Sequence, residues 1–542
     1  MEIWGKSNPP PFKDFKIMVI TTQNENSKNP LILGIVFLLA YWVLGYDGIT
    51  FSDELTYLRL GHQWWNNETV ISEYHFSSRW GAYVFSGFFT HLFGYHDRYA
   101  SLASLLFYVI TLTVLWKVTP TLQGKKWVTL FFISHIYLLH FLPKVYPDSF
   151  LVLWVVMIPA SAIFRHKYPS LAAFMMAMTF LVGFSTKETM VFLFPYPLLL
   201  LWLDFKLKTP LHFYYHLAIF SAICVLLFFS YYYINFGDFL YRFKSINQGH
   251  YISEYTYHDK GWVSILKRIT YTPILTFMER TYWLWLVLAI PGIIEGIRNK
   301  VSPSLEFSLC SICLLGGFWL MSSTLEFYNP IYLNPRHLII LIGPLAVNIA
   351  LGAPYWQKVF LYKKWLIGLL VLGGVYSCVF VDWKIGVFYF LISVLIVGRS
   401  NKYGFVMIAF SLILPVIFAV CYQHQVKNYP HFLNFFQSTV LQSSQETPIL
   451  THEFVFQSKD VLVNQPEKNV PVYSLYSMDS IKKFPPEKIT LFVYKYYRHA
   501  YKEEGNYLEM AEDWIKKEGY QIISSYKDPW LRITVYRKHK KK

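Results

Sequence analysis

Long apolar runs recur along this chain from residue 31 to residue 421, and they constrain its fold more than any other feature. Hydrophobic residues make up 54% of the 542 residues, charged residues make up 15%, and the mean hydropathy is +0.32. A soluble domain needs more polar surface than this composition provides. Because backbone groups in lipid must be hydrogen-bonded within each span, we predict a polytopic α-helical membrane protein.

About thirteen of these runs approach the ~20 residues that a transmembrane helix needs. If the N-terminal segment 1–30 lies in the cytoplasm, every connection expected on that side carries Lys or Arg and few acids, as the positive-inside rule requires. An odd number of spans then places the residues after 421 outside. The predicted spans lie near 31–48, 98–117, 127–142, 148–164, 170–184, 188–204, 211–234, 281–297, 304–323, 337–356, 365–381, 384–398 and 403–421.

Two further segments indicate structure outside the spans. In the first outer loop, 49–97, the stretches 53–65 and 79–94 have helical apolar faces, and counting 79–94 as a span would invert every later loop, so we predict two surface helices. The tail, 422–542, combines β-rich stretches, among them "PILTHEFVF" at 448–456, with an amphipathic helix, which predicts a small extracytoplasmic α/β domain. One face of that helix is expected to carry Leu508, Ala511, Trp514 and Ile515. The transmembrane module is therefore expected to cover 31–421.

Acids and bases gather in the outer loops. A single ionisable residue at a span end is an ordinary boundary marker, and we interpret Asp47 in this way. Recurrence of such residues on one side of a helical bundle instead predicts a site. The candidate residues are Asp53, Glu54, Arg79, Asp148, Lys187, Glu188 and Arg336.

The chemistry of this cluster favours a lipid-phosphate substrate. Cations suit a phosphate head, and a phosphate that leaves with its electrons needs charge neutralisation rather than a proton. One basic carboxylate, for which we choose Asp53, would then take the acceptor's proton. The net charge of +16 lies mostly in short loops and at the C-terminus, which indicates contacts with membrane lipids and argues against nucleic acid as a partner.

The motifs "SDELTYLRLG", "SSRWGAYVFSGFFTHLFG", "YPDSF", "STKET" and "NPRHLIILIGPLAV" resemble the GT-C membrane glycosyltransferases. The resemblance is to the branch that contains protein O-mannosyltransferases and the lipid A aminoarabinose transferase, and it runs from residue 31 to about residue 356. It implies an inverting transfer of a hexose or pentose from a polyprenyl-phosphate donor to a glycan, lipid or protein acceptor. It also implies a site on the outer face of a bacterial inner membrane.

The resemblance assigns roles residue by residue. It makes Asp53 the catalytic residue, with Glu54 and Asp148 supporting it. Arg79, Lys187, Glu188 and Arg336 would bind substrate or phosphate, although aminoarabinose transferases carry a lysine in "EKPP" where this chain has "SSRW". Some GT-C enzymes use a divalent metal ion, which Asp53, Glu54 and Asp148 could hold.

Two other classes of function stay open. A secondary transporter places ionisable groups near the middle of the membrane and often has inverted repeats, whereas this chain shows no repeat and keeps its acids at one face. A non-catalytic relative would bind lipid-linked sugar without transferring it. Geometry tests the proposed site: Asp53, Asp148, Lys187 and Arg336 should face one outward cavity, and their separation onto different faces of the bundle would contradict it.

Overall fold

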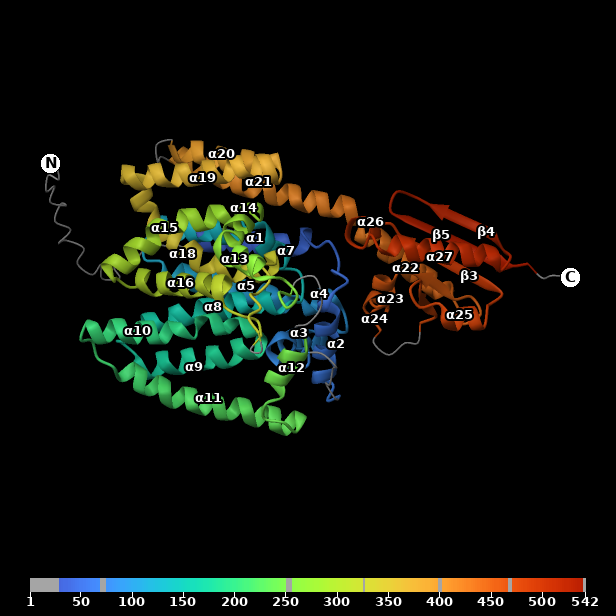
Figure 1. Cartoon of the computed structure of the whole chain (residues 1–542), viewed down its shortest axis with the longest axis horizontal. Coiled ribbons are helices and arrows are strands. Elements are labelled where there is room, and N and C mark those ends of the chain that lie inside the picture. Colours follow the sequence, from blue (N-terminus) through green and yellow to red (C-terminus); the bar gives the residue numbers. More distant parts are fainter. Residues whose placement is uncertain are drawn as a thin grey trace.

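The computed structural model describes residues 29–68, 75–249, 256–324, 327–397, 402–465 and 470–539. The expected cytoplasmic segment 1–30 lies almost wholly outside these residues. A bundle of helices forms one part of the molecule, and a smaller α/β domain made by the end of the chain lies beside it (Figure 1).

Within the described residues, seven helical segments are long and apolar enough to cross a membrane, and a pair bent by 111° would make an eighth. Four shorter apolar helices accompany them: α1 (Asn29–Leu44), α8 (Pro147–Ile163), α16 (Ser304–Leu320) and α20 (Trp383–Val397). The chain is thus an integral, multi-pass membrane protein, while the count of thirteen spans stays a prediction. The seven segments are Asp97–Val118 (α4 and α5), Pro169–Thr186 (α9), Glu188–Lys206 (η2 and α10), His212–Phe236 (α11), Pro335–Trp356 (α17, η4 and most of α18), Phe360–Phe380 (α19) and Tyr403–Gln442 (α21 and α22).

The bundle is packed from the inside by apolar side chains and presents apolar side chains outward. Leu112, Val155 and Val347 are fully buried, whereas Leu226 on α11 and Phe410 on α21 are exposed, as lipid-facing residues are. Close packing at its centre depends on a small residue. A Cβ on Gly292 of α15 (Tyr282–Asn299) would lie 2.0 Å from the carbonyl oxygen of Asn348 on α18 (Ile342–Lys358), so only glycine lets these helices approach so closely.

Two predicted elements differ in detail. The span expected at 127–142 is broken, because α6 (Leu122–Ile133) ends and the His135 side chain accepts from the backbone N–H of Leu138 to begin α7 (Ile136–His140). The boundary expected at residue 422 falls inside α21, which continues to Lys427. Because α21 continues without a break past residue 421, the sequence gives no local signal for the point where the helix leaves the bundle.

Both helices expected in the first outer loop are present as α2 (Asp53–Trp65) and α3 (Trp80–Phe93). They cross at two glycines, since a Cβ on Gly87 would lie 2.2 Å from the carbonyl oxygen of Gly61. These two helices, which we call the platform, lie at the end of the bundle nearest the C-terminal domain (Figure 1).

The C-terminal domain confirms the predicted α/β class. Its sheet has the order β2-β1-β3-β5-β4, with β1 parallel to β2 and β3, and β5 antiparallel to β3 and β4. The predicted amphipathic helix is α27 (Glu504–Lys517), with Leu508, Ala511 and Ile515 buried. The strands are β1 (Ile449–Thr451), β2 (Val472–Ser474), β3 (Lys488–Tyr494), β4 (Tyr520–Lys527) and β5 (Leu531–Lys538).

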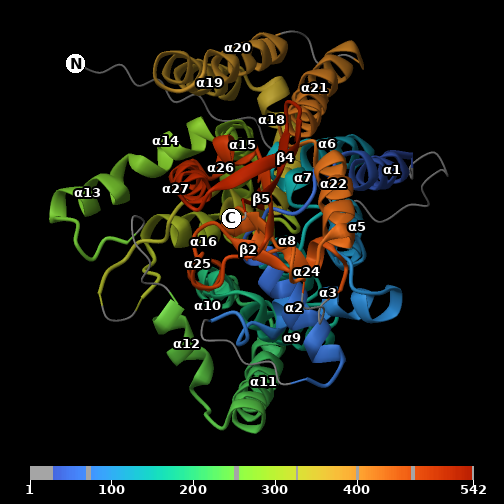
Figure 2. The same cartoon turned by 90° about the vertical axis from the view of Figure 1, so that its right-hand side faces the viewer.

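Sequence reasoning missed one strand and overextended another. The edge strand β4 is exposed beyond its first residue, so it carries no apolar alternation. The strand expected at 448–456 ends at Thr451, because the Glu504 carboxylate accepts from the backbone N–H of Glu453 at 3.1 Å and begins α23 (Glu453–Phe456) there. When the right-hand side of Figure 1 faces the viewer, the C-terminal domain lies in front of the centre of the helical bundle (Figure 2).

Candidate functional site

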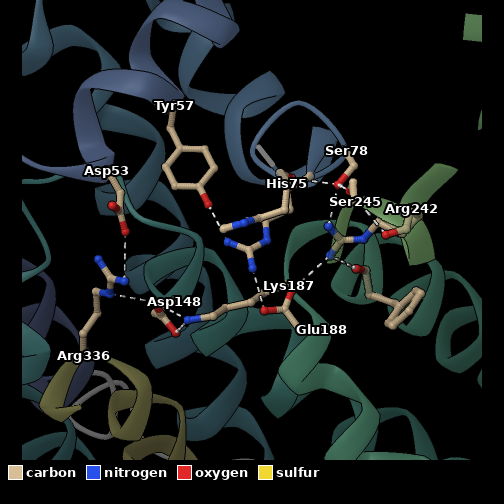
Figure 3. Close-up of polar contacts among 12 residues, drawn as sticks. Asp53, Tyr57, His75, Ser78, Asp148, Lys187, Glu188, Arg242, Ser245 and Arg336 are labelled. Carbon is tan, nitrogen blue, oxygen red and sulfur yellow. Dashed lines mark hydrogen bonds and ion pairs between the residues drawn. The ribbon is translucent and has the colours of Figure 1, made fainter. Parts of the chain in front are cut away.

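Asp53 opens α2, where a carboxylate is favoured by the helix dipole. Its Oδ2 accepts a hydrogen bond of 3.1 Å from Nη2 of Arg336, and 36% of its side chain remains exposed. Arg336 comes from α17 (Pro335–Leu338), whose start is capped by the side chain of Asn334. Two helices whose paired residues are separated by 283 positions thus meet at one ion pair (Figure 3).

Asp148 lies behind this pair, in the first turn of α8, and is fully buried. Lys187, at the end of α9, donates to both of its oxygens at 2.7 and 2.9 Å. Nε of Arg336 lies 3.4 Å from Asp148 Oδ2, so Arg336 joins the buried acid to the exposed one (Figure 3). Asp148 is thereby neutralised by two cations and is suited to holding Lys187 and Arg336 in place.

Glu188 follows Lys187 directly and bridges two arginines. Its Oε1 lies 2.5 Å from Nη2 of Arg79, and its Oε2 lies 3.3 Å from Nη2 of Arg242 on α12 (Tyr241–Gly249). Arg79 also donates to the hydroxyl of Tyr57 at 2.8 Å. Although burial disfavours its charge, Glu188 raises the pKa of Arg79, which therefore stays cationic.

The cluster contains more cations than anions. Four cationic side chains meet three carboxylates, and the Nε groups of Arg79 and Arg242 are buried with no hydrogen-bond partner among the described residues. A buried donor without an acceptor is costly, so an incoming anion would be stabilised here. We call this set the anion cluster; it consists of Asp53, Arg79, Asp148, Lys187, Glu188, Arg242 and Arg336.

Glu54 points away from its neighbour Asp53, since adjacent helical positions differ by ~100°. It is 1% exposed, and its carboxylate accepts from the backbone N–H and the hydroxyl of Thr50, each at 2.9 Å, and from the N–H of Val145 at 3.2 Å. Burial raises the pKa of Glu54. Its contacts are those of a residue that joins the platform to the loop before α8.

The metal site expected from Asp53, Glu54 and Asp148 is wrong for this structure. Among the described residues, no group of three His, Cys, Asp or Glu side chains could hold a metal ion. The physical reason is that Glu54 is engaged by backbone N–H groups, while Asp148 is engaged by Lys187 and Arg336.

The interpretation of Asp47 as a boundary marker is also wrong. Asp47 is 3% exposed and lies 2.9 Å from Nζ of Lys144 and 3.5 Å from Nζ of Lys427. Although burial opposes its charge, these two ammonium groups hold the pKa of Asp47 well below its usual range. It joins the end of α1, the loop before α8 and the end of α21.

Sequence reasoning missed two groups in the cluster. Tyr57 lies one helical turn after Asp53, a spacing that places both on one face of α2 and could have revealed it. Arg242 is fully buried and donates to the hydroxyl of Ser78 at 2.9 Å (Figure 3). It lies in the long connection 235–280, which is rich in Tyr, Lys and Arg, and no local signal separates it from its neighbours.

Comparisons with known proteins support the fold. No family model matches this sequence, and no curated protein matches it. Among solved structures, ArnT from Cupriavidus metallidurans in the apo state matches with a TM-score of 0.54 and 12% identity, over 94% of this chain and 98% of that one. The same ArnT bound to undecaprenyl phosphate matches with a TM-score of 0.55 and 13% identity over the same shares. This chain therefore shares the fold of ArnT, and in this chain that fold consists of a multi-pass helical module followed by a small α/β domain.

Proposed function

We propose that this protein is a glycosyltransferase that moves a sugar from a polyprenyl-phosphate donor to an acceptor. One observation carries the proposal: an exposed carboxylate, Asp53, stands at the edge of the cation-rich anion cluster. A reaction in which a phosphate leaves and a hydroxyl attacks needs both features side by side.

In this proposal, Arg79 and Arg242 bind the donor phosphate. Each already contacts one oxygen of Glu188, so Glu188 occupies the place between them that a second anion would take. Tyr57 supports this role, because burial raises the pKa of Tyr57 to about 12 and the phenol keeps its proton to donate. An ArnT structure holds undecaprenyl phosphate, which supports a lipid phosphate as the ligand of a protein with this fold.

Asp53 acts as the general base. Its exposed side chain can reach an acceptor hydroxyl, whereas Asp148 is buried under Lys187 and Arg336. Attack on the sugar carbon from the side opposite the phosphate would invert its configuration. Arg336 keeps the Asp53 carboxylate oriented, and Asp148 keeps Arg336 and Lys187 in position.

We place the site and the C-terminal domain on the outer face of the membrane, the periplasmic side of a bacterial inner membrane. The Lys and Arg residues of the connections assigned to the cytoplasm support this orientation. The acceptor in this proposal is a glycan, a lipid or a protein that is available at that face.

The decisive experiment compares Asp53→Asn with the unaltered protein. Envelope glycans and lipid-linked sugars are compared in cells with and without the gene, and then in cells that carry the variant. We expect transfer to fall by about 10²- to 10⁴-fold, because the amide keeps the shape and lacks the basicity. Lipid-linked sugar should accumulate while the Tm stays unchanged.

Asp513→Asn, at an exposed position of α27, is the matched control and should leave transfer intact. Full transfer by Asp53→Asn would contradict its role as base. Unchanged glycans and lipid-linked sugars on deletion of the gene would contradict the transferase itself and favour a transporter or a non-catalytic binder.

A further inference from the structure

Residues 47–51, which lie within the segment that joins α1 to α2, are held by residues from the C-terminal part of the chain. The carbonyl oxygen of Ile49 accepts a hydrogen bond of 2.7 Å from Nζ of Lys427. The next two carbonyl oxygens, of Thr50 and Phe51, accept from the hydroxyl of Tyr501 at 3.0 and 3.2 Å. Three consecutive carbonyl groups are therefore bound by two side chains that lie more than 370 residues further along the chain.

The side chain of Phe51 is anchored in the same way. Phe51 is 6% exposed, and its ring lies 5.0 Å from that of Phe454 and 6.0 Å from that of Phe432. Its φ of 55° lies in the left-handed region, which a bulky residue adopts only when its surroundings hold it there. The C-terminal aromatic residues provide these surroundings.

Gly48 brings the backbone against the same aromatic group. Its φ is 89°, and a Cβ at this position would lie 2.1 Å from the ring of Tyr429. Only glycine accommodates both the conformation and the contact. Residues 47–51 therefore pack against three elements: the end of α21, α22 (Tyr429–Gln442) and the C-terminal domain.

The C-terminal domain contacts α2 again two turns later. Nε and Nη2 of Arg59 donate to the Asp460 carboxylate at 2.7 and 2.5 Å, and the hydroxyl of Tyr95 donates to it at 2.8 Å. One end of α2 is thus fixed through the segment before it, and its middle is fixed directly. A shift of the domain would have to move the helix that begins with Asp53.

We propose that the C-terminal domain positions Asp53, and that Tyr501 is a positioning residue for the transfer reaction. The inference rests on the proposed function, since it concerns the same carboxylate. Tyr501 acts through the carbonyl groups of Thr50 and Phe51, and Thr50 in turn holds Glu54. Small displacements of a catalytic group lower the rate strongly, so loss of this anchor should slow turnover without weakening donor binding.

The test uses Tyr501→Phe in the full-length protein in lipid nanodiscs. Hydrogen–deuterium exchange is measured over residues 47–55, and undecaprenyl phosphate is the binding probe. Turnover is measured as polyprenyl phosphate released from the lipid-linked sugar fraction of the producing cells. We expect faster exchange of this segment and about a tenfold lower kcat, because one anchoring hydroxyl is lost. The KM for the donor and the Kd for undecaprenyl phosphate should not change.

Tyr520→Phe is the matched control, because its hydroxyl also donates to a backbone carbonyl, that of Pro486, inside the same domain. It should leave both exchange at 47–55 and kcat unchanged at a comparable Tm. Unchanged exchange in Tyr501→Phe, faster exchange with unchanged kcat, or the same changes in Tyr520→Phe would each overturn the inference. If the unaltered protein releases no polyprenyl phosphate, the proposed function fails instead, and the exchange measurement alone decides whether Tyr501 holds the segment.

Discussion

The two ends of α8 carry two ion-pair clusters of different character. At its first turn lies the anion cluster, with Asp53 36% exposed and Glu188 18% exposed. Just beyond its last turn, about 25 Å away along the helix, Arg165 pairs with Asp204 at 2.8 Å and Glu306 at 2.5 Å. In this second cluster both acids are fully buried, and the side chain of Arg165 is 6% exposed.

The difference between these clusters separates a structural ion pair from a candidate site. The Arg165 cluster joins the end of α8 to α10 (Pro195–Lys206) and α16, and its one guanidinium pairs with two carboxylates. The hydroxyl of Tyr214 also donates to Asp204 at 2.6 Å. The anion cluster has the opposite balance, with cations in excess and one acid open to solvent. Ion pairs at span ends therefore indicate function only where exposure and charge balance leave room for a ligand.

Replacing Arg165 tests the structural side of this comparison and should have the largest effect. Arg165→Leu leaves two buried carboxylates without their cation, which should cost about 3–5 kcal/mol of unfolding free energy. We expect little folded protein in membranes and a strongly lowered Tm in detergent. An unchanged Tm in Arg165→Leu together with a strongly lowered Tm in Asp53→Asn would contradict this assignment of structural and functional roles.

Replacing Arg79 tests the ligand side. Arg79→Met removes a charged donor from the anion cluster and should weaken binding of undecaprenyl phosphate by roughly 10- to 100-fold. Arg298→Met is the matched control, because Arg298 lies in the last turn of α15 with 70% of its side chain exposed. Equal affinities of the two variants in a binding titration would remove Arg79 from the phosphate site.

Replacing Glu188 tests the charge balance of the anion cluster, because we predict that its carboxylate competes with the ligand phosphate for Arg79 and Arg242. Glu188→Gln removes the charge that bridges Arg79 and Arg242, so undecaprenyl phosphate should bind about three- to tenfold more tightly. The gain should shrink at high salt, as it does for partly exposed charges. A weaker affinity would show that Glu188 organises the arginines for binding rather than competing with the phosphate.

The smallest effect concerns the contact between α2 and the C-terminal domain. Although burial raises it, the hydrogen bonds from Arg59 lower the pKa of Asp460 overall, so the folded state binds its proton less readily than the unfolded state. The stabilisation is present above about pH 4 and is lost as the pH falls through the folded-state pKa. Because the side chain of Arg59 is 35% exposed, we expect the Arg59–Asp460 pair to contribute only about 0.2–1 kcal/mol to the free energy of unfolding.

Hydrogen exchange of residues 453–465 between about pH 5 and pH 3 measures this contact. Exchange there, corrected for the intrinsic rate, should rise as the pH falls, and Asp460→Asn should remove that rise. A rise of the same size in Asp460→Asn would assign the pH dependence to another group.

Much of the fold could be predicted from local patterns. Hydropathy identified a multi-pass helical protein, and the helical faces of 53–65 and 79–94 identified both platform helices. Of the four residues predicted on the apolar face of α27, Leu508, Ala511 and Ile515 are buried and Trp514 is half-buried. These patterns succeed because each reflects burial of residues close together in sequence.

The site could be predicted only in part. The seven candidate residues were found as acids and bases at span ends, and six of them meet in the anion cluster, while their catalytic roles stay predictions. Arg242 was not found, because nothing local distinguishes a buried arginine from exposed ones in the same loop. The metal site failed because a list of acids does not show which partners already occupy them.

The sequence by itself determined where charges interrupt the apolar runs, and hence which end of the bundle carries the candidate site. Only the tertiary structure decided how three nearby acids differ: Asp47 is buried between two lysines, Glu54 is buried against backbone N–H groups, and Asp53 is open. The physical reason is that the state of a carboxylate depends on its surroundings. Those of Asp47, Glu54 and Asp53 come from the loop before α8, the end of α21 and α17, which lie far away in the sequence.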